Sequence, residues 1–387
     1  MSDLLKEKLS TLSPEQRELL RKRASQKKRD SADDSFAMDF SLFFFSASGE
    51  ECSSNKYDML LQCAELADRG GIKAIWLPER HFTHFGGLYP NPSVLAAAVA
   101  MKTRNIELRA GSVVVPLHNP IRIVEEWSVV DNLSNGRVSL GLASGWNKED
   151  FALRPEAWHD RRQRVAEGME QMQRLWQGEV IEVNGVDNEK EVVQTFPRPI
   201  QDKLNYWLTC SSEDGWKIAG EKGCNVLCML GNSINLLAQN IENYRQARTA
   251  AGFDPNGGTV TVMLHTYIDD DLVRAKEEVR QPMMQYLTGY IKQFDNLVNE
   301  QTRDNVNENK QQLLDFAFER YFEQAALFGP KSKCKELIAE LNRIGVNEIA
   351  CLVDFGVPLE NTLSSLTNLT ELAAMYPSSN SKANSND

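Results

Sequence analysis

The stretch AIWLPERHFTHFGGLYPNP (residues 74–92) changes character abruptly and decides how the rest of the chain is interpreted. Residues 74–77 form an apolar run of the kind expected for a fully buried strand. The charged and imidazole side chains that follow at once are Glu79, Arg80, His81 and His84. In a parallel α/β barrel, chemistry lies in the loops after the carboxyl ends of strands. This stretch therefore predicts both a strand and a candidate site.

Strand-like runs recur along the chain, and helix-like stretches separate them. The runs are MDFSLFFFS, KAIWL, IELRAGSVVV, RVSLGLAS, NYWLT, NVLCML, TVTVMLHTYI and NEIACLVDF. Runs that are nearly continuous in apolar character are typical of a parallel sheet covered by helices on its faces. Eight repeats favour a (β/α)8 TIM barrel over a doubly wound sheet. A mostly helical connection, roughly residues 270–345, predicts an insertion before the last strand that overhangs the mouth of the barrel.

Composition shifts divide the chain into three parts. Residues 1–35 contain LSPEQRELLRKRASQKKR, which predicts a basic helical appendage with Ser13 as N-cap. A solvated appendage is favoured over a nucleic-acid segment, because no aromatic residues are interleaved with the charge. Residues 36–375 are assigned to the barrel. Residues 376–387 end in PSSNSKANSND and predict a disordered tail.

The totals exclude several classes of protein. The chain has 387 residues, a net charge of −11 and a pI of about 5.2, which argues against nucleic acid or an anionic membrane as the main partner. Its apolar runs are too short to cross a bilayer, and the first residues lack an apolar signal core, so we expect a cytosolic protein. The seven cysteines lack the paired spacing of a disulfide framework or a metal site, so we expect free thiols and no bound metal.

Other polar groups are expected at the same barrel mouth because they follow other strands. These segments are Ser46, residues 111–114, residues 144–147 and residues 210–214. His81 is the candidate acid or base, with a buried histidine bonded to the loop backbone as the alternative. Arg80 could instead pair with Glu79 or Asp68, and His84 could be a rim residue. We expect His118 to cap or pack. Nucleotide-binding, serine hydrolase and metalloprotease motifs are absent.

The chain resembles the luciferase-like flavin monooxygenases. The resemblance is carried by WLPERHFTHFGGLYPNPSVLAAAVA, SVVVPLHNPIRIVEEWSVVDNLSNGRVSLGLASGWNKEDF and IAGEKGCNVL, and it spans roughly residues 38–356. The core is most similar to the subgroup found beside non-ribosomal peptide and polyketide synthases, and LSPEQRELLRKR resembles their linkers. The resemblance implies a homodimeric barrel that binds reduced FMN supplied by a separate flavin reductase, while the protein orients the cofactor.

The resemblance also implies which residues contact the cofactor. The candidates are Ser46, Gly111, Ser112, Val113, Ala143, Ser144, Trp146, Arg164, Ser211, Ser212, Asp214 and Gly215. A non-proline cis peptide is implied in residues 111–113, and a phosphate-binding turn at Ser211 and Ser212, where hydroxyls meet a helix N-terminus. One of Arg161, Arg162 and Arg164 is implied as the phosphate arginine, and the choice among them stays open.

The chain departs from the light-emitting members of the family at three positions. Those members carry a histidine at Arg80, a reactive cysteine at Ala143 and an arginine at Ser144. We therefore do not expect light emission, and His81, flanked by Arg80 and His84, inherits the acid/base role. The leading hypothesis is a monooxygenase of secondary metabolism that hydroxylates an acyl or amino-acyl group, on a carrier protein rather than free. The alternatives are deazaflavin-dependent hydride transfer and a non-catalytic synthase-associated barrel.

Overall fold

The computed structural model describes residues 36–45, 56–83, 87–230, 233–295 and 310–378. The predicted appendage, residues 1–35, lies outside the described residues, as do Ser46 and His84.

The carboxyl end of the described chain packs against the first strand. The Tyr376 ring is buried, with its centroid 5.7 Å from that of Phe40. Ser378 Oγ donates a hydrogen bond to Asp39 Oδ1 at 2.8 Å. The disordered tail predicted for residues 376–387 is therefore wrong for residues 376–378, because a buried aromatic ring anchors them.

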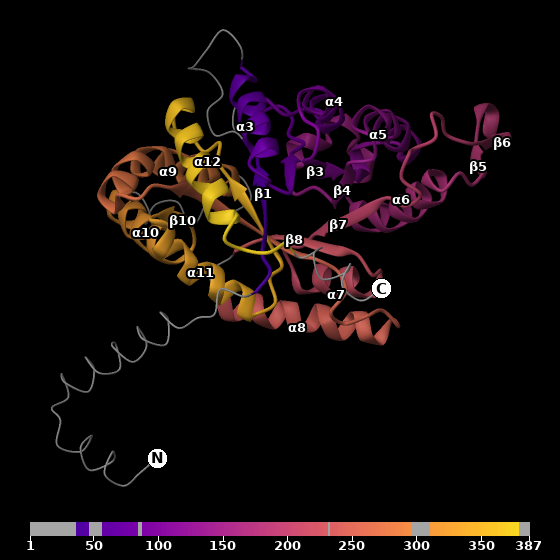
Figure 1. Ribbon diagram of the computed structural model, residues 1–387. Helices are drawn as coiled ribbons and strands as arrows, with labels where there is room; N and C mark the ends of the chain where they lie inside the picture. Colours follow the sequence, from indigo (N-terminus) through magenta and orange to yellow (C-terminus); the bar gives the residue numbers. More distant parts are fainter. Residues whose placement is uncertain (1–35, 46–55, 84–86, 231–232, 296–309, 379–387) are drawn as a thin grey trace.

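Eight parallel strands close into a barrel, as the apolar runs predicted (Figure 1). In sheet order they are β11 (Glu348–Leu352), β1 (Asp39–Phe43), β2 (Ala74–Leu77), β3 (Glu107–Val114), β4 (Val138–Ala143), β7 (Asn205–Thr209), β8 (Asn225–Met229) and β9 (Val260–Ile268). Pairing of β8 with β9, and of β9 with β11, completes the ring. The (β/α)8 barrel is confirmed.

Helices follow the strands and cover the outside of the barrel. They are α3 (Asp58–Arg69), α4 (Pro92–Lys102), α5 (Pro120–Ser134), α6 (Arg161–Trp176), α7 (Glu213–Glu221), α8 (Ile234–Ala250), α9 (Leu272–Asp295), α10 (Lys310–Gln324), α11 (Lys331–Arg343) and α12 (Leu359–Ala373). Helices α4 and α5 begin in the same way, with an asparagine N-cap (Asn91, Asn119) followed by proline at the first helical position. No helix in the described part of the chain is long and apolar enough to span a membrane.

A buried ion pair fills the barrel interior. Arg109 Nη1 on β3 donates to both carboxylate oxygens of Glu348 on β11, each at 2.8 Å. The guanidinium carbon lies 4.3 Å and 4.9 Å from the ring centroids of Trp207 and Trp76. Ser41 Oγ donates to Glu348 Oε1 at 2.6 Å. Side chains of five strands thus meet in one layer, as in other barrels whose interior is a packed core.

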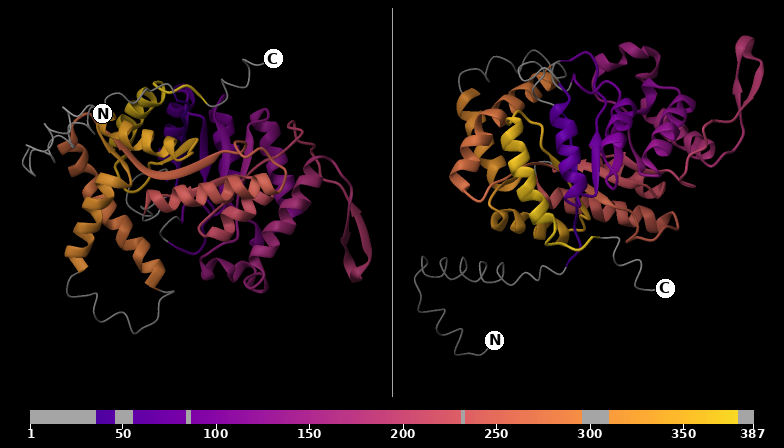
Figure 2. Two further views of the ribbon diagram at one scale, coloured as in Figure 1. Left: turned by 90° about the horizontal axis from the view of Figure 1, so that it is seen from below. Right: turned by 45° about the horizontal axis from the view of Figure 1, so that its top comes forward.

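A helical insertion, α9 and α10, precedes β11 as predicted, and it lies on one side of the barrel (Figure 2). His265, buried on β9, places its Nδ1 2.7 Å from the Tyr321 hydroxyl of α10. Its ring centroid is 4.4 Å from that of Tyr286 on α9. Burial lowers the pKa of His265 to about 3, so this imidazole is neutral and joins the insertion to the barrel as a packing group. A short strand, β10 (Leu327–Gly329), pairs in parallel with the end of β9 and was not predicted.

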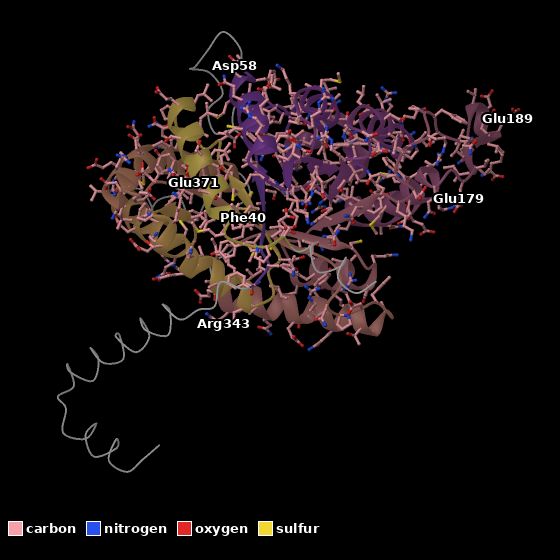
Figure 3. All side chains as sticks on the ribbon, viewed as in Figure 1. Phe40, Asp58, Glu179, Glu189, Arg343 and Glu371 are labelled. Atoms are coloured by element: carbon pink, nitrogen blue, oxygen red, sulfur yellow. The ribbon has the colours of Figure 1, made fainter. Side chains whose placement is uncertain are left out.

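A two-stranded hairpin projects from the barrel between β4 and β7 in the chain (Figures 1 and 3). Its strands are β5 (Ile181–Asn184) and β6 (Lys190–Val193), and Glu189 lies in the turn between them. Val186 and Val192 are 81% and 68% exposed. Ile181, at the base of the hairpin, is buried in the hydrophobic core, so the hairpin is anchored at its base while its tip is exposed.

Candidate active site at the barrel mouth

Glu79, directly after β2, is the centre of a hydrogen-bonded group. Its side chain is buried, and Oε2 accepts the backbone N–H of Val114 at 2.7 Å. Oε1 lies 2.9 Å from Nε2 of His81 and 2.5 Å from Nε2 of His118. An ionised carboxylate can only accept hydrogen bonds, so both imidazoles direct an Nε2–H toward it. Protons are then gained and lost at Nδ1 of each ring.

Glu79 and His118 each stabilise the charged form of the other. Burial alone would raise the pKa of Glu79, but hydrogen bonds from His118 and His81 outweigh it and lower the pKa. Burial would lower the pKa of His118, yet the hydrogen bond and the charge of Glu79 raise it. Glu79 therefore stays ionised, and His118 stays charged to a higher pH than a free histidine.

His118 does not have the role that the sequence suggested. The N-cap of α5 is Asn119, whose Oδ1 accepts the backbone N–H of Ile121 at 3.0 Å. His118 precedes that cap and turns its ring to Glu79, with 35% of the side chain exposed. This contact could not be predicted from the sequence, because Glu79 and His118 are 39 residues apart.

His81 is held by a side chain and not by the loop backbone. Its ring is 11% exposed, and its Nε2 contact is the Glu79 carboxylate. A histidine oriented by a buried carboxylate is a common arrangement for a general acid or base. His81 therefore has the geometry expected of a proton-transfer residue at the end of β2.

Arg80 lies between two aromatic rings at the mouth. Its guanidinium carbon is 4.9 Å from the Phe45 ring centroid, after β1, and 5.0 Å from that of Trp146, after β4. The pairing with Glu79 or Asp68 that the sequence left open is not formed, because Glu79 binds two imidazoles and Asp68 accepts the backbone N–H groups of residues 104–106. Arg80 thus brings the ends of three strands together.

Two buried carboxylates at the mouth were missed by the sequence analysis. Asp354, after β11, accepts the Phe45 backbone N–H at 2.7 Å and the Tyr89 hydroxyl at 3.1 Å. Asp150, in the loop after β4, accepts a hydrogen bond from Asn147 Nδ2 at 2.8 Å. Burial raises the pKa of Asp150, although the positive charge of Arg80 opposes this. Asp354 fixes the loop after β1, and Asp150 adds a second titratable group near Arg80.

The predicted cis peptide lies between Gly111 and Ser112 on β3. The Ser112 hydroxyl is 2.5 Å from the Thr209 hydroxyl at the end of β7. Ala143, Ser144 and Trp146 follow at the end of β4, between these two strands, and Trp146 is 39% exposed. The predicted residues of the third and fourth strands therefore share one rim.

The turn at Ser211 and Ser212 begins helix α7. Both serines are exposed, and Ser212 is the N-cap, yet its hydroxyl makes no hydrogen bond to the helix. The first N–H groups of a helix also have no partner within it. Asp214 is exposed in the first turn, and Gly215 N donates to Ser212 O at 3.0 Å. Hydroxyls and helix-terminal N–H groups suit a phosphate, so these residues fit the flavin phosphate that the resemblance implies.

The three arginines at the start of α6 differ in their surroundings. Arg164 Nε donates to Asp160 Oδ1 at 2.7 Å. Arg161 lies 4.1 Å over the Trp158 ring and donates from Nη1 to Trp158 O, while its buried Nε has no partner among the described residues. Arg162 is exposed. Because Arg164 already has a carboxylate partner, Arg161 is the better placed to accept a further anion.

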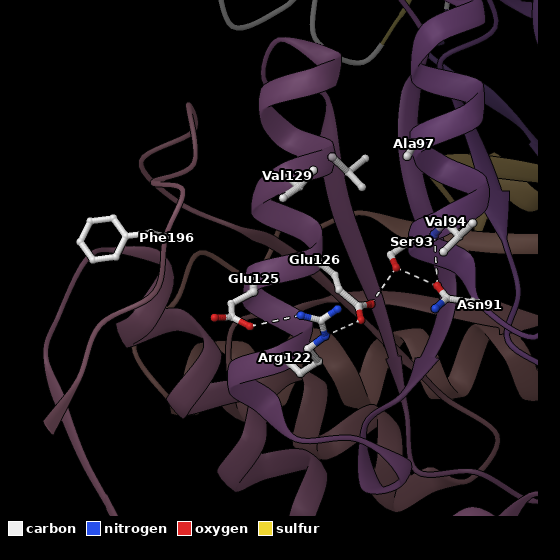
Figure 4. Close-up of a pocket in the computed structure, with 10 residues that line it drawn as sticks. Asn91, Ser93, Val94, Ala97, Arg122, Glu125, Glu126, Val129 and Phe196 are labelled. Carbon is white, nitrogen blue, oxygen red and sulfur yellow. Dashed lines mark hydrogen bonds and ion pairs between the residues drawn. The ribbon is translucent and has the colours of Figure 1, made fainter. Parts of the chain in front are cut away.

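A hollow of about 500 Å³ lies on the outside of the barrel, between α4 and α5 (Figure 4). Its lining residues include Val94, Ala97, Arg122, Val129 and Phe196. It is lined by residues of α4 and α5 and by Phe196, so it belongs to the outer helical layer of the barrel. A smaller cavity of about 60 Å³ beside it is lined by both Glu79 and His118.

Residues 38–348 match the family described as luciferase-like monooxygenases, and the chain belongs to this family of oxidoreductases. The flavin-dependent trigonelline monooxygenase, oxygenase component, of Acinetobacter baylyi is 32% identical over 195 residues. That match covers 49% of this chain and 53% of the relative, so the chain spans about half of that relative's length. An alkanal monooxygenase alpha chain of Photorhabdus luminescens is 24% identical over 323 residues, covering 79% of this chain and 88% of the relative.

Solved structures share the fold. The monooxygenase RslO1 of Streptomyces bottropensis covers 87% of this chain and 99% of its own, with a TM-score of 0.72 and 23% identity. The oxygenating constituent of 3,6-diketocamphane monooxygenase from Pseudomonas putida, solved with FMN, covers 88% and 99%, with a TM-score of 0.69 and 19% identity. An F420-dependent secondary alcohol dehydrogenase covers 87% and 99%, with a TM-score of 0.65 and 15% identity. At these identities the likeness concerns the fold alone.

Proposed function

We propose that this protein is a flavin-dependent monooxygenase that uses reduced FMN and O2 to hydroxylate a substrate. Family membership supports the reaction class. The observation that carries the choice of cofactor is a shared rim: the backbone of residues 111–113, the N-terminus of α7 and His81 all lie at the carboxyl ends of barrel strands. A cofactor with a planar ring and a phosphate needs such a combination of backbone and anion contacts.

The residues at the rim would each make a different contribution to binding the cofactor. Bound reduced FMN would supply the electrons that activate O2. Ser211, Ser212 and the first N–H groups of α7 would hold the phosphate, with Arg161 as the added positive charge. Residues 111–113 would support the ring with backbone. Trp146 would limit water entry at the mouth, since its large ring stands half exposed at the rim.

His81 would handle the proton in this scheme. The Nε2–H bond to Glu79 fixes the ring, so that a proton is taken up or released at Nδ1. The buried Glu79 carboxylate holds the orientation of the imidazole.

The cofactor proposal is tested by titrating FMN and riboflavin, oxidised and reduced, against the parent and a Ser211→Ala/Ser212→Ala variant. We expect reduced FMN to bind more tightly than oxidised FMN. The double substitution should weaken FMN roughly 5- to 30-fold, at about 1 kcal/mol for each lost hydrogen bond, and leave riboflavin unchanged. If neither redox state of FMN binds a folded protein, the proposal is wrong.

A deazaflavin-dependent hydride transfer is the second candidate. Its support is the shared fold of the F420-dependent dehydrogenase. The two candidates differ in the fate of oxygen. With 18O2 and a flavin reductase, a monooxygenase incorporates one labelled atom into its product, whereas a deazaflavin dehydrogenase incorporates none and turns over without O2.

We further propose that the substrate is an acyl or amino-acyl group of secondary metabolism, presented on a carrier protein. The support is the sequence resemblance to the synthase-associated subgroup and the basic segment at residues 1–35. Carrier proteins are usually acidic, so such a segment could steer one by charge. Turnover of one acyl group should be compared free, as a pantetheine thioester and on its carrier. Equal efficiency of the free form would refute carrier presentation.

We also propose that a second copy of this chain covers the outer face of α4 and α5. Helix α4 (PSVLAAAVAMK) is apolar on nearly all sides, a pattern usual for a helix buried all round. Yet Val94 and Met101 are 63% and 69% exposed, and Val129 and Leu133 of α5 are 43% and 47% exposed. Phe196, 63% exposed, extends the same face (Figure 4).

A further inference from the structure

We propose that His118 is a positioning residue which, through Glu79, controls the protonation of His81 and links the outer α4–α5 surface to the barrel mouth. The inference rests on the proposed role of His81 as the proton-transfer group. The observation behind it is that one oxygen atom, Glu79 Oε1, accepts hydrogen bonds from both imidazoles. Nε2 of His81 lies 2.9 Å from it and Nε2 of His118 lies 2.5 Å from it.

Glu79 cannot move away from either histidine. Its other oxygen is fixed by the Val114 backbone N–H at 2.7 Å, and the side chain is fully buried. A change in the charge of one imidazole is therefore felt by the other, because both share the same acceptor at short distance in a poorly solvated place. Two groups coupled in this way titrate as a pair.

The two histidines face different surroundings. Glu79 and His118 line the small cavity between α4 and α5, together with Ser93 and Glu126, whereas His81 does not line it. His118 is about three times as exposed as His81, at 35% against 11% of the side chain. His118 is therefore the more accessible of the two imidazoles and borders the cavity between α4 and α5, whereas the charge of His81 acts on Asp150 after β4.

The charged groups around His118 favour its protonation. Glu126 on α5 faces it and raises its pKa together with Glu79, and Arg154 opposes this while donating from Nη1 to His118 O at 2.9 Å. Arg122, on the same cavity, is paired with Glu126 at 3.0 Å. When His118 is protonated, its positive charge offsets that of Glu79, and the carboxylate supports a proton on His81 less strongly.

Deprotonation of His118 has the opposite effect. Glu79 then offers its full negative charge to His81, and the protonated form of His81 gains stability. The pair thus works as a relay of charge and needs no movement of the backbone. A change of charge beside His118, between α4 and α5, therefore alters the protonation of His81 at the barrel mouth.

The first experiment needs no flavin and no substrate. The imidazole signals of the apoprotein are followed by 1H–13C NMR from about pH 5 to 9 and assigned by single substitution. In the parent, the His81 signal should show an inflection at the midpoint of the His118 titration. His118→Gln, which keeps an N–H donor but cannot carry charge, should abolish that inflection. His159→Asn, at an exposed position, is the matched control and should preserve it.

The second experiment follows the holoenzyme. His118→Gln should shift the acidic limb of the kcat–pH profile toward higher pH, because Glu79 then offers its full negative charge to His81. The KM for reduced flavin should stay unchanged, since His118 lies away from the mouth. Glu79→Gln should remove the pH dependence that His118 imposes.

The outcomes are separable. A His81 signal that titrates identically in the parent and His118→Gln, with both proteins folded, overturns the coupling whatever the enzyme does. Coupling in the NMR titration without any flavin binding would leave the charge relay intact and refute the proposed function instead.

Discussion

Ser112 Oγ and Thr209 Oγ1 lie 2.5 Å apart although their strands, β3 and β7, are not neighbours. Strand β4 runs between them, and the contact is possible because β4 has Gly141 at this level. A Cβ at position 141 would lie 3.3 Å from Ser112 Oγ and 2.6 Å from Ala110 O. Because Gly141 has no side chain, Ser112 on β3 can hydrogen-bond to Thr209 on β7, the strand that precedes the Ser211–Ser212 turn.

Thr209→Val should weaken FMN binding about fivefold, because one hydrogen bond of roughly 1 kcal/mol that holds the cis segment is lost. The melting temperature should change little, since Thr209 is exposed. Fluorescence quenching titrations measure the affinity. Thr209→Ser keeps the hydroxyl and should bind like the parent. Equal affinity of the valine variant would show that the tie does not support the cofactor.

His81→Asn should lower turnover about 10²- to 10⁴-fold, the usual contribution of a positioned acid or base. The asparagine amide can still donate to Glu79, so the fold should be retained. Steady-state assays with a flavin reductase measure the rate, and melting curves report stability. His159→Asn serves as the control, and a parent-like rate for His81→Asn would assign His81 a structural role only.

Glu348→Gln should destabilise the protein by about 3 kcal/mol, because it removes the fully buried counter-charge of Arg109 and leaves only the partly exposed Glu107. The matched control is Glu107→Gln. Glu107 also binds Arg109, at 2.7 Å, but its side chain is 32% exposed, so its loss should cost at most about 1 kcal/mol. Urea unfolding gives both values, and similar costs for the two variants would contradict this account.

The contribution of the Glu79–His118 pair to stability should peak in mildly acidic solution. The lowered pKa of Glu79 gives a contribution that is present above its ordinary value of 4.5 and lost as pH falls through the folded value. The raised pKa of His118 gives one that is complete below its ordinary value of 6.5 and lost as pH rises through the folded value. The stability difference between the parent and His118→Gln should therefore be largest between these values and shrink at alkaline pH, in urea titrations across the range. A constant difference would contradict the ion pair.

Met101→Glu with Val129→Glu should convert a dimer into a monomer, because two carboxylates on an apolar interface are costly to bury. Light scattering coupled to size-exclusion chromatography measures the mass. Val186→Glu, on the exposed hairpin, introduces the same chemistry elsewhere and should leave the mass unchanged. If the parent is already monomeric at micromolar concentration, the proposed face is not an interface between copies.

The sequence predicted best those elements that show a pattern among adjacent residues. All eight barrel strands were predicted because each is an apolar run that is buried on both faces. The hairpin was missed because its strands, such as KEVV in β6, are short and mostly exposed and lack a core-facing pattern. Strand β10 was missed because three residues carry too little pattern.

The sequence predicted where candidate site residues lie along the strands, but not which residues they contact. His81 and residues 111–113 lie where strand ends indicated, but the partners of His118, Thr209 and Asp354 depend on contacts across 39, 97 and 309 residues. Such contacts exist only once the barrel has closed. A histidine next to a helix start, as in LHNP, gives no local signal of a carboxylate on another strand.

The ion pair inside the barrel has a consequence for synthesis on the ribosome. Arg109 is made early, whereas its partner Glu348 follows 239 residues later on the last strand. Until that strand emerges, a nascent barrel would have to enclose the guanidinium with only the partly exposed Glu107 as its counter-charge, which is unfavourable. The early strands are therefore expected to stay open and hydrated during translation, and the domain to close only after the final strand leaves the exit tunnel.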